Sequence, residues 1–91
     1  NIENLEEEIS IYPNPASDQI YIKFNSKNEQ HIFFDVFNLN GQHLSVFKRD
    51  KASGIMSLDV KGDLNISEPG LYFYRIIYGN YKLTGKITII K

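Results

Sequence analysis

The sequence predicts an all-β domain, an antiparallel β-sandwich of about seven short strands. Apolar residues recur at a period of two, as in Ile20, Ile22 and Phe24, and this alternation is typical of strands that bury one face. Turn-forming residues separate the alternating runs at regular spacing, and no stretch has a convincing helical period. A small β-barrel is the alternative architecture.

We expect the first strand over residues 9–12, and it ends there because Pro13 and Pro15 fix φ and lack an N–H. The second strand, 18–25, begins at Asp18, which we expect to accept backbone hydrogen bonds. The polar letters NSKNEQ lead into a third strand over 31–38.

The letters NLNG, residues 38–41, end in an Asn-Gly step, and both of these residue types accept positive φ. They predict a tight turn about residues 39 and 40, and therefore a hairpin over 31–48 whose second strand is 42–48. The letters DKASG then precede a fifth strand over 55–61.

A Pro-Gly pair precedes the sixth strand, 70–78, and a Gly-Asn pair leads into the seventh, 81–90. These two strands form a second hairpin over 70–90. Because a terminal strand at a sheet edge has unpaired backbone groups, we expect that a partner could extend the sheet there by β-augmentation.

Composition limits what the chain can do. Its 91 residues are enough for one domain, and six Phe and six Tyr can fill a core. The absence of Cys excludes disulfides and thiolate chemistry. The net charge of -1 gives no signature of binding to nucleic acid or to a membrane surface.

The acidic residues are unevenly placed. Residues 1–8 carry four of the eleven acids and no base, so the rest of the chain has ten bases and seven acids. We interpret 1–8 as an acidic linker that enters a domain over 9–91. The chain begins with Asn1 and has neither a leader pattern nor an apolar run near 18 residues, so we expect it to be part of a longer protein.

The two histidines predict no metal site. If the first hairpin turns about residues 39 and 40, His31 faces Lys48 and His43 faces Val36. The two rings would then lie roughly 20 Å apart, which is too far for a shared metal.

The carboxylates predict no catalytic site. Asp18, Asp35, Asp59 and Asp63 fall on different turns and strands, and a paired-carboxylate hydrolase needs two of them ~5–10 Å apart in a cleft. We expect Asp35 to be solvated, because it is out of phase with the core positions of its strand. No nucleophile elbow, phosphate loop or zinc-protease motif occurs, so we expect neither an enzyme nor a cofactor nor a small-molecule substrate.

Aromatic residues outside the core pattern leave one alternative open. Tyr21, Phe33, Phe37 and Phe73 could form a row on the outward faces, and aromatic rows can stack on sugars. The chain would then be a carbohydrate- or protein-binding module of a larger secreted protein. Packing against a neighbouring domain would explain the same residues.

Three segments together resemble one known family. They are IYPNPASDQIYIKF (11–24), VFNLNGQHL (36–44) and LNISEPGLYFYRIIYGNYKLTGKITIIK (64–91). In this order and spacing, with Lys91 at the end, they resemble the C-terminal sorting domain of the type IX secretion system, the type A family. The resemblance extends from about Ile9 to Lys91.

The resemblance implies a seven-stranded, Ig-like β-sandwich attached to a large exported cargo protein of Gram-negative bacteria of the Bacteroidota type. It implies transit through the periplasm, then a place at the cell surface or secretion. The implied partners are the outer-membrane translocon, a barrel-shaped shuttle protein and a surface sortase-like peptidase. The peptidase would cut within about the first ten residues.

The motif residues of the family carry over one by one. Asn38, Gly41 and Gly79 match turn positions, and a structural role is favoured for Gly41, Gly70 and Tyr72. For Lys86 and Lys91, recognition and a merely exposed position are both open. The candidates for recognition by the translocon are Pro13, Asn14, Pro15, Asp18, Gly70, Tyr72, Gly85, Lys86 and Lys91.

Overall fold

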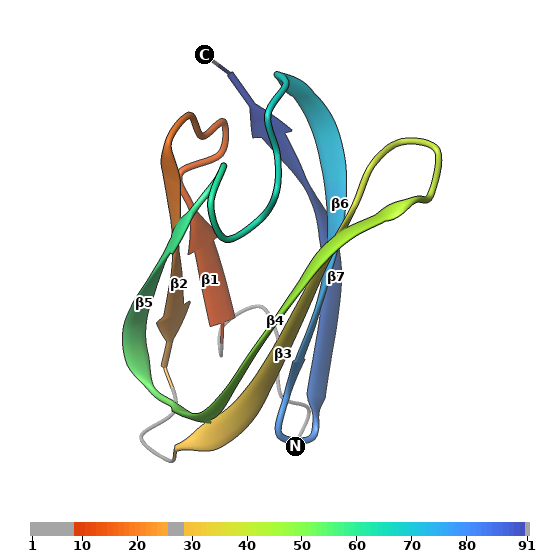
Figure 1. Ribbon diagram of the computed structural model, residues 1–91. Coiled ribbons are helices and arrows are strands. Elements are labelled where there is room, and N and C mark those ends of the chain that lie inside the picture. The colour runs from red at the N-terminus through yellow and green to blue at the C-terminus, as the bar shows by residue number, and fades with distance from the viewer. Residues whose placement is uncertain (1–8, 26–28, 91) are drawn as a thin grey trace.

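The computed structural model describes residues 9–25 and 29–90. Within them the chain forms seven strands and no helix (Figure 1). The strands are β1 (Ile9–Tyr12), β2 (Gln19–Phe24), β3 (Gln30–Phe37), β4 (His43–Ala52), β5 (Gly54–Asp59), β6 (Gly70–Tyr78) and β7 (Tyr81–Ile89).

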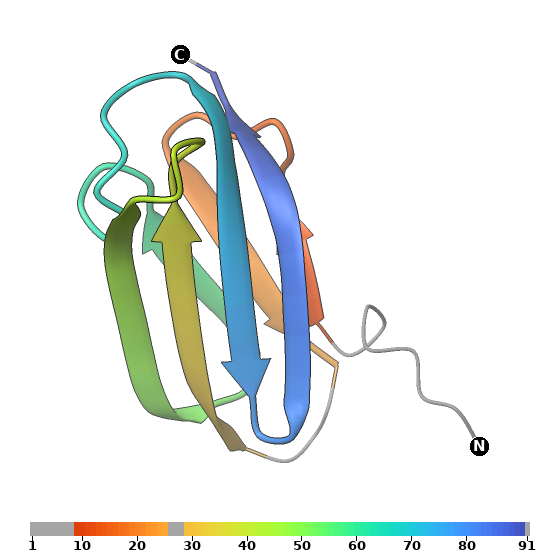
Figure 2. The ribbon, with the colours of Figure 1, turned by 90° about the vertical axis from the view of Figure 1, so that its right-hand side faces the viewer.

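The strands form two antiparallel sheets that lie face to face (Figures 1 and 2). The smaller sheet has the order β1-β2-β5, and the larger sheet has the order β4-β3-β6-β7. Every strand pair is antiparallel. The predicted β-sandwich is therefore confirmed, in preference to a small barrel.

The core lies between the two sheets and receives at least one buried side chain from each strand. Alternation places these side chains in the core. Along β2, for example, Ile20, Ile22 and Phe24 are buried and the residues between them are not. Phe24 stacks on Tyr78 of the facing sheet with ring centroids 4.5 Å apart. The Tyr78 hydroxyl donates a hydrogen bond to the Ala52 carbonyl at 3.1 Å, which satisfies this buried polar group.

Two strands differ from the predicted bounds for a common reason. β4 continues to Ala52, and β5 begins only two residues later at Gly54, where φ is +73°. The chain thus passes directly from the larger sheet to the smaller one, instead of ending at residue 48 and forming a loop. A left-handed glycine at the crossing permits this abrupt change of direction.

The predicted register of the first hairpin is wrong. The loop between β3 and β4 spans residues 38–42, and two irregularities shift the pairing of the strands. His43 therefore faces Phe37 instead of Val36, and Lys48 faces Phe33 instead of His31. The second hairpin is confirmed, since Tyr78 pairs with Tyr81 across a two-residue turn.

Candidate functional site

The proline turn of the first motif lies against the edge of β7. The Asn14 side chain donates a hydrogen bond from Nδ2 to the Lys86 carbonyl at 3.1 Å, and its Oδ1 accepts one from the Thr88 N–H at 3.0 Å. Pro13 and Pro15 on either side are exposed, and both are preceded by cis peptide bonds. The Asn14 side chain therefore makes two of the hydrogen bonds that fix the first motif to the last one.

Ala16 extends this contact along β7. Its N–H donates to the Thr88 carbonyl at 2.9 Å, and its carbonyl accepts from the Ile90 N–H at 2.7 Å. The Ala16 side chain is buried, so the turn also contributes to the core. The expectation that the edge of the terminal strand is unpaired is thus wrong between residues 86 and 90, because the proline turn occupies it.

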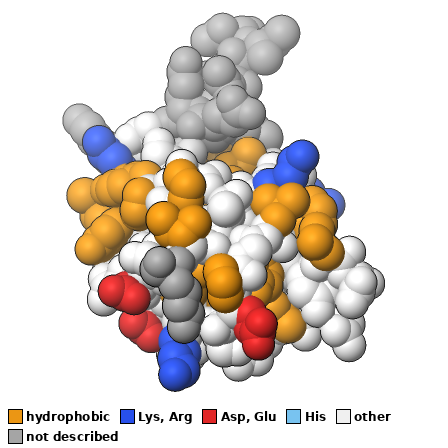
Figure 3. Space-filling view, turned by 90° about the horizontal axis from the view of Figure 1, so that it is seen from above, with side chains coloured by type: hydrophobic (Ala, Val, Ile, Leu, Met, Phe, Trp, Pro, Cys, Tyr) orange, Lys and Arg blue, Asp and Glu red, His pale blue; other side chains and the backbone are white. Residues whose placement is uncertain are grey.

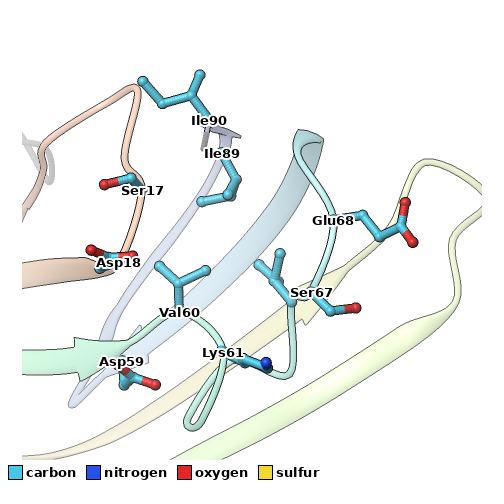
Figure 4. A pocket seen from close by; sticks show the side chains of 10 residues that line it. Ser17, Asp18, Asp59, Val60, Lys61, Ser67, Glu68, Ile89 and Ile90 are labelled. Carbon is cyan, nitrogen blue, oxygen red and sulfur yellow. The ribbon is translucent and has the colours of Figure 1, made fainter.

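Asp18 lies where this turn enters β2. Its backbone carbonyl accepts a hydrogen bond from the Val60 N–H at 2.8 Å, while its exposed carboxylate has no hydrogen-bond partner among residues 9–25 and 29–90. The carboxylate lines a hollow of about 410 Å³ together with Lys61, Glu68 and Ile90 (Figure 4). The atom of Asp18 that accepts a hydrogen bond is therefore its main-chain carbonyl oxygen and not its carboxylate. The exposed carboxylate can contact a partner.

The G-x-Y motif begins β6 next to the end of β7. Gly70 pairs with Ile89 and has a φ of +150°, which residues with a side chain rarely adopt. Tyr72 is half-buried against the core, and its hydroxyl donates to the Glu68 carbonyl at 2.6 Å. These contacts give both residues structural roles in shaping the turn.

The loop of the second motif lies beside this turn. Asn38 Oδ1 accepts hydrogen bonds from the N–H groups of Asn40 and Gln42, each at 2.9 Å, and Gly41 has a φ of +83°. The predicted two-residue turn is replaced by this wider loop, which the Asn38 side chain organises. A hollow of about 300 Å³ separates the loop from the segment that contains Gly70 and Tyr72.

The three motifs consequently meet at one end of the sandwich, which is uppermost in Figure 1. We name this end the motif pole and define it as residues 13–18, 38–41, 59–72 and 86–90. Figure 3 looks down on it and shows several groups of hydrophobic side chains, with acidic side chains toward the lower side of the view. Asp18, Asp59, Asp63 and Glu68 are all exposed there.

Of the remaining candidates for recognition, Gly85 has a structural role and Lys86 has an exposed side chain. Gly85 pairs with Tyr74, and a Cβ at Gly85 would lie 2.5 Å from the Tyr74 hydroxyl oxygen, so any larger residue there would have to displace this ring. Lys86 offers its carbonyl to Asn14, while its side chain is exposed. Lys91 and the acidic segment 1–8 lie outside the described residues.

Sequence reasoning missed one buried polar group. Asp35 is 2% exposed, against the expectation that it is solvated, and it forms an ion pair with Arg75. Its other oxygen lies 3.8 Å from His43 Nε2. Arg75 lies directly opposite Asp35 on β6, and this pairing indicates a buried ion pair. It can be predicted only when the register of β3 against β6 is known.

The expected aromatic row is divided between the two sheets. Phe33, Phe37 and Phe73 belong to β3 and β6 of the larger sheet. Tyr21 lies on the smaller sheet, where it stacks on Tyr12 with ring centroids 5.6 Å apart. The prediction that these four rings could form one row is therefore wrong.

The described part of the chain has no group of three or more His, Asp or Glu side chains that could hold a metal ion. It also has no helix that is long and apolar enough to cross a membrane.

Comparison with known proteins identifies the family of this chain. The model of a family described as the secretion system C-terminal sorting domain matches residues 10–91. The chain belongs to this family. Members of the family are C-terminal sorting signals of type IX secretion and are not catalytic, so the sorting domain is a signal for export to the cell surface or for secretion. This membership favours the sorting signal over the binding-module alternative.

One solved structure supports the fold of the sorting domain. The crystal structure of dimeric latent PorU from Porphyromonas gingivalis matches it with a TM-score of 0.64 and 16% sequence identity. The match covers 90% of the sorting domain and 9% of the PorU chain. A comparison with curated protein sequences found no match.

Proposed function

We propose that the secretion machinery recognises this sorting domain at the motif pole. The observation that carries the proposal is the connection of the first and last motifs through Asn14, which binds the backbone of Lys86 and Thr88. Segments at opposite ends of the chain are thereby held in one surface. Such a surface exists only after the domain has folded, so the machinery could use it to distinguish a folded domain from an unfolded chain.

The residues of the pole fall into two groups by their contacts. Asn14, Gly70 and Tyr72 are engaged in hydrogen bonds, register or packing, and they fix the shape of the surface. Asp18 presents a carboxylate with no hydrogen-bond partner among the residues that the structure describes, and Ile90 presents a side chain that is 49% exposed, beside the same hollow. We assign recognition to the second group, because free polar and exposed apolar groups are what a partner can bind.

Membership of the family also supports a proposal for the steps before and after recognition. The sorting domain would carry an N-terminal cargo across the periplasm to the outer-membrane type IX translocon and its barrel-shaped shuttle protein. A surface sortase-like peptidase would then cut within about the first ten residues and release the cargo or leave it at the surface. The identity of the cargo does not affect this role, because the recognised surface belongs to the domain.

A fusion tests the proposed role. Residues 1–91 are placed at the C-terminus of a periplasmic reporter in a host that has type IX secretion, and the reporter is measured in the medium, at the surface and in the periplasm. We expect export of the fusion and retention of the unfused reporter. A fusion that stays in the periplasm with a folded domain would contradict the role. A tag added after Lys91 should reduce export, whereas a free C-terminus would be irrelevant to a binding module.

A further inference from the structure

The outer face of the larger sheet differs from an ordinary solvated sheet face. We name it the cationic face, and in Figure 2 it is turned toward the viewer. Phe73 and Val46 on it are 37% and 43% exposed. The face is defined by outward side chains of β3, β4, β6 and β7, namely His31, Phe33, Asp35, Phe37, His43, Val46, Lys48, Asp50, Phe73, Arg75, Ile77, Lys82, Thr84 and Lys86.

Two hollows lie side by side on this face. One has a volume of about 440 Å³ and is lined by residues that include Phe33, Val46 and Lys48. The other has a volume of about 460 Å³ and is lined by residues that include Phe73 and Lys86. Phe37 and Arg75 line both, so they form the ridge between them. Each hollow thus combines a phenyl ring with a lysine.

Arg75 holds the ridge in place. Its guanidinium pairs with Asp35, and its Cζ atom lies 6.0 Å from the ring centroids of both Phe33 and Phe37. This pairing neutralises Asp35, the carboxylate buried at the centre of the face. Asp50, two residues beyond Lys48 on β4, is a further acid of this face and lies 3.4 Å from His31. Lys48, Lys82 and Lys86 outnumber it and form no ion pair within the described part of the chain, so the face keeps a net positive charge.

Two polar atoms beneath the first hollow make no hydrogen bond to any residue that the structure describes, although His43 Nε2 lies 3.8 Å from one of them. They are Asp35 Oδ1, on a side chain that is 3% exposed, and Arg75 Nε. A buried acceptor and a buried donor without partners are costly, and native structures normally satisfy them. Both atoms have almost no accessible surface, so a partner on this face would contact the rings and lysines around them and not these two atoms.

We propose that the cationic face binds an acidic protein segment in which carboxylates stand beside apolar side chains. The apolar side chains would fill the two hollows, and the carboxylates would pair with Lys48 and Lys86. Complementary charge of this kind fixes the register of a partner and increases its association rate. This inference does not rest on recognition at the motif pole.

The register of the sheet sets the length of the segment. Lys48 on β4 and Lys86 on β7 are three strand spacings apart, and the pairings place them four residues apart along the strand direction. These offsets give a separation of roughly 20 Å, which an extended segment of about six residues spans. A bound segment would therefore cross the strands obliquely and would not extend the sheet.

A titration of the full 91-residue chain tests the proposal. The probe is a synthetic eight-residue peptide with four Glu and two Leu and uncharged ends, observed by NMR. We expect chemical-shift changes at Phe33, Phe37 and Phe73, and we expect binding to weaken at least tenfold when the Glu residues are replaced by Gln. Absence of binding up to about 1 mM peptide would overturn the proposal, and so would equal binding of the Gln peptide.

Matched variants distinguish this face from general attraction between charges. Lys48→Glu with Lys86→Glu should weaken binding at least tenfold, whereas Lys23→Glu with Lys61→Glu, which are exposed elsewhere, should change it less than twofold. Equal losses in the two pairs would overturn the proposal. If the first pair unfolds the chain, Lys48→Gln with Lys86→Gln removes the same charges without adding acids, and the same comparison applies.

Discussion

Asn14 and Thr88 are 74 positions apart in the sequence, and the Thr88 N–H donates a hydrogen bond to Asn14 Oδ1 at 3.0 Å. The same side chain donates to the Lys86 carbonyl. The proline turn therefore does more than end the first strand, because it covers the edge of the last one. Edge strands that remain uncovered tend to pair with other chains, and this turn prevents that along residues 86–90.

Replacement of Asn14 by Ala removes both hydrogen bonds and leaves the Thr88 N–H without its partner. We expect the free energy of unfolding to fall by about 1–2 kcal/mol, which corresponds to a decrease of several degrees in melting temperature. Thermal and urea unfolding of the purified chain measure the change. Asn40→Ala is the control, since that exposed side chain has no hydrogen bond among the described residues, and an equal loss in both variants would contradict the assigned role of Asn14.

Gly85→Ala tests whether the Tyr74 ring is the reason why residue 85 has to be glycine. A Cβ there would lie 2.6 Å from Cζ of Tyr74, so the ring has to move, and overpacking of this kind costs ~1–3 kcal/mol. In a Tyr74→Leu background the smaller side chain makes room, and Gly85→Ala should then cost less than half as much. A double-mutant cycle from urea unfolding measures this coupling. Equal costs in the two backgrounds would show that the Tyr74 ring does not impose the requirement for glycine.

Arg75→Met leaves the buried Asp35 carboxylate without its counter-ion. Loss of one partner from a buried pair costs ~3–5 kcal/mol, and because the Arg75 side chain is 40% exposed we expect the lower part of that range. Arg49→Met is the control, because Arg49 lies over the Phe47 ring at 5.2 Å and forms no ion pair among the described residues. We expect it to cost at most about 1 kcal/mol. Similar costs for the two variants, measured by urea unfolding, would show that the Asp35 pair contributes little.

Deletion of residues 82–91 should unfold the domain. It removes most of β7, including Ile87 and Ile89, which are 2% and 3% exposed, and it removes the backbone that Asn14 and Ala16 bind. We expect the deleted chain to lose its cooperative melting transition by circular dichroism. Loss of export in such a deletion would therefore report loss of the fold. A deleted chain that still melts cooperatively would contradict the place of β7 in the core.

The sequence predicted the strands well, because alternation and turn residues are local signals. The run Ile20, Ile22 and Phe24 identifies its own buried face. The NLNG letters identified a turn but gave the wrong loop length, since the Asn38 side chain closes a wider loop by binding two backbone N–H groups. This error changed the register and with it the neighbours of both histidines.

The candidate site depended on pairings between distant parts of the chain. Alternation along β3 places Asp35 on the face away from the core, but it does not show that aromatic rings and Arg75 cover that face. Likewise, nothing near Asn14 in the sequence indicates that its partners are at residues 86 and 88. Similarity to a known family supplied the order of the motifs, and the structure supplied the surface that they form.

Export of surface variants tests recognition at the motif pole most directly. Asp18→Asn with Ile90→Ser removes the free carboxylate and the exposed side chain beside the hollow, and Asp50→Asn with Ile55→Ser makes the same changes at exposed positions away from the pole. Both fusions should melt within roughly 5 °C of the parent, because the replaced side chains are largely exposed. We expect the first pair to lower reporter export at least tenfold and the second to leave it unchanged. Unchanged export of the first pair, with the domain folded, would contradict recognition at the motif pole.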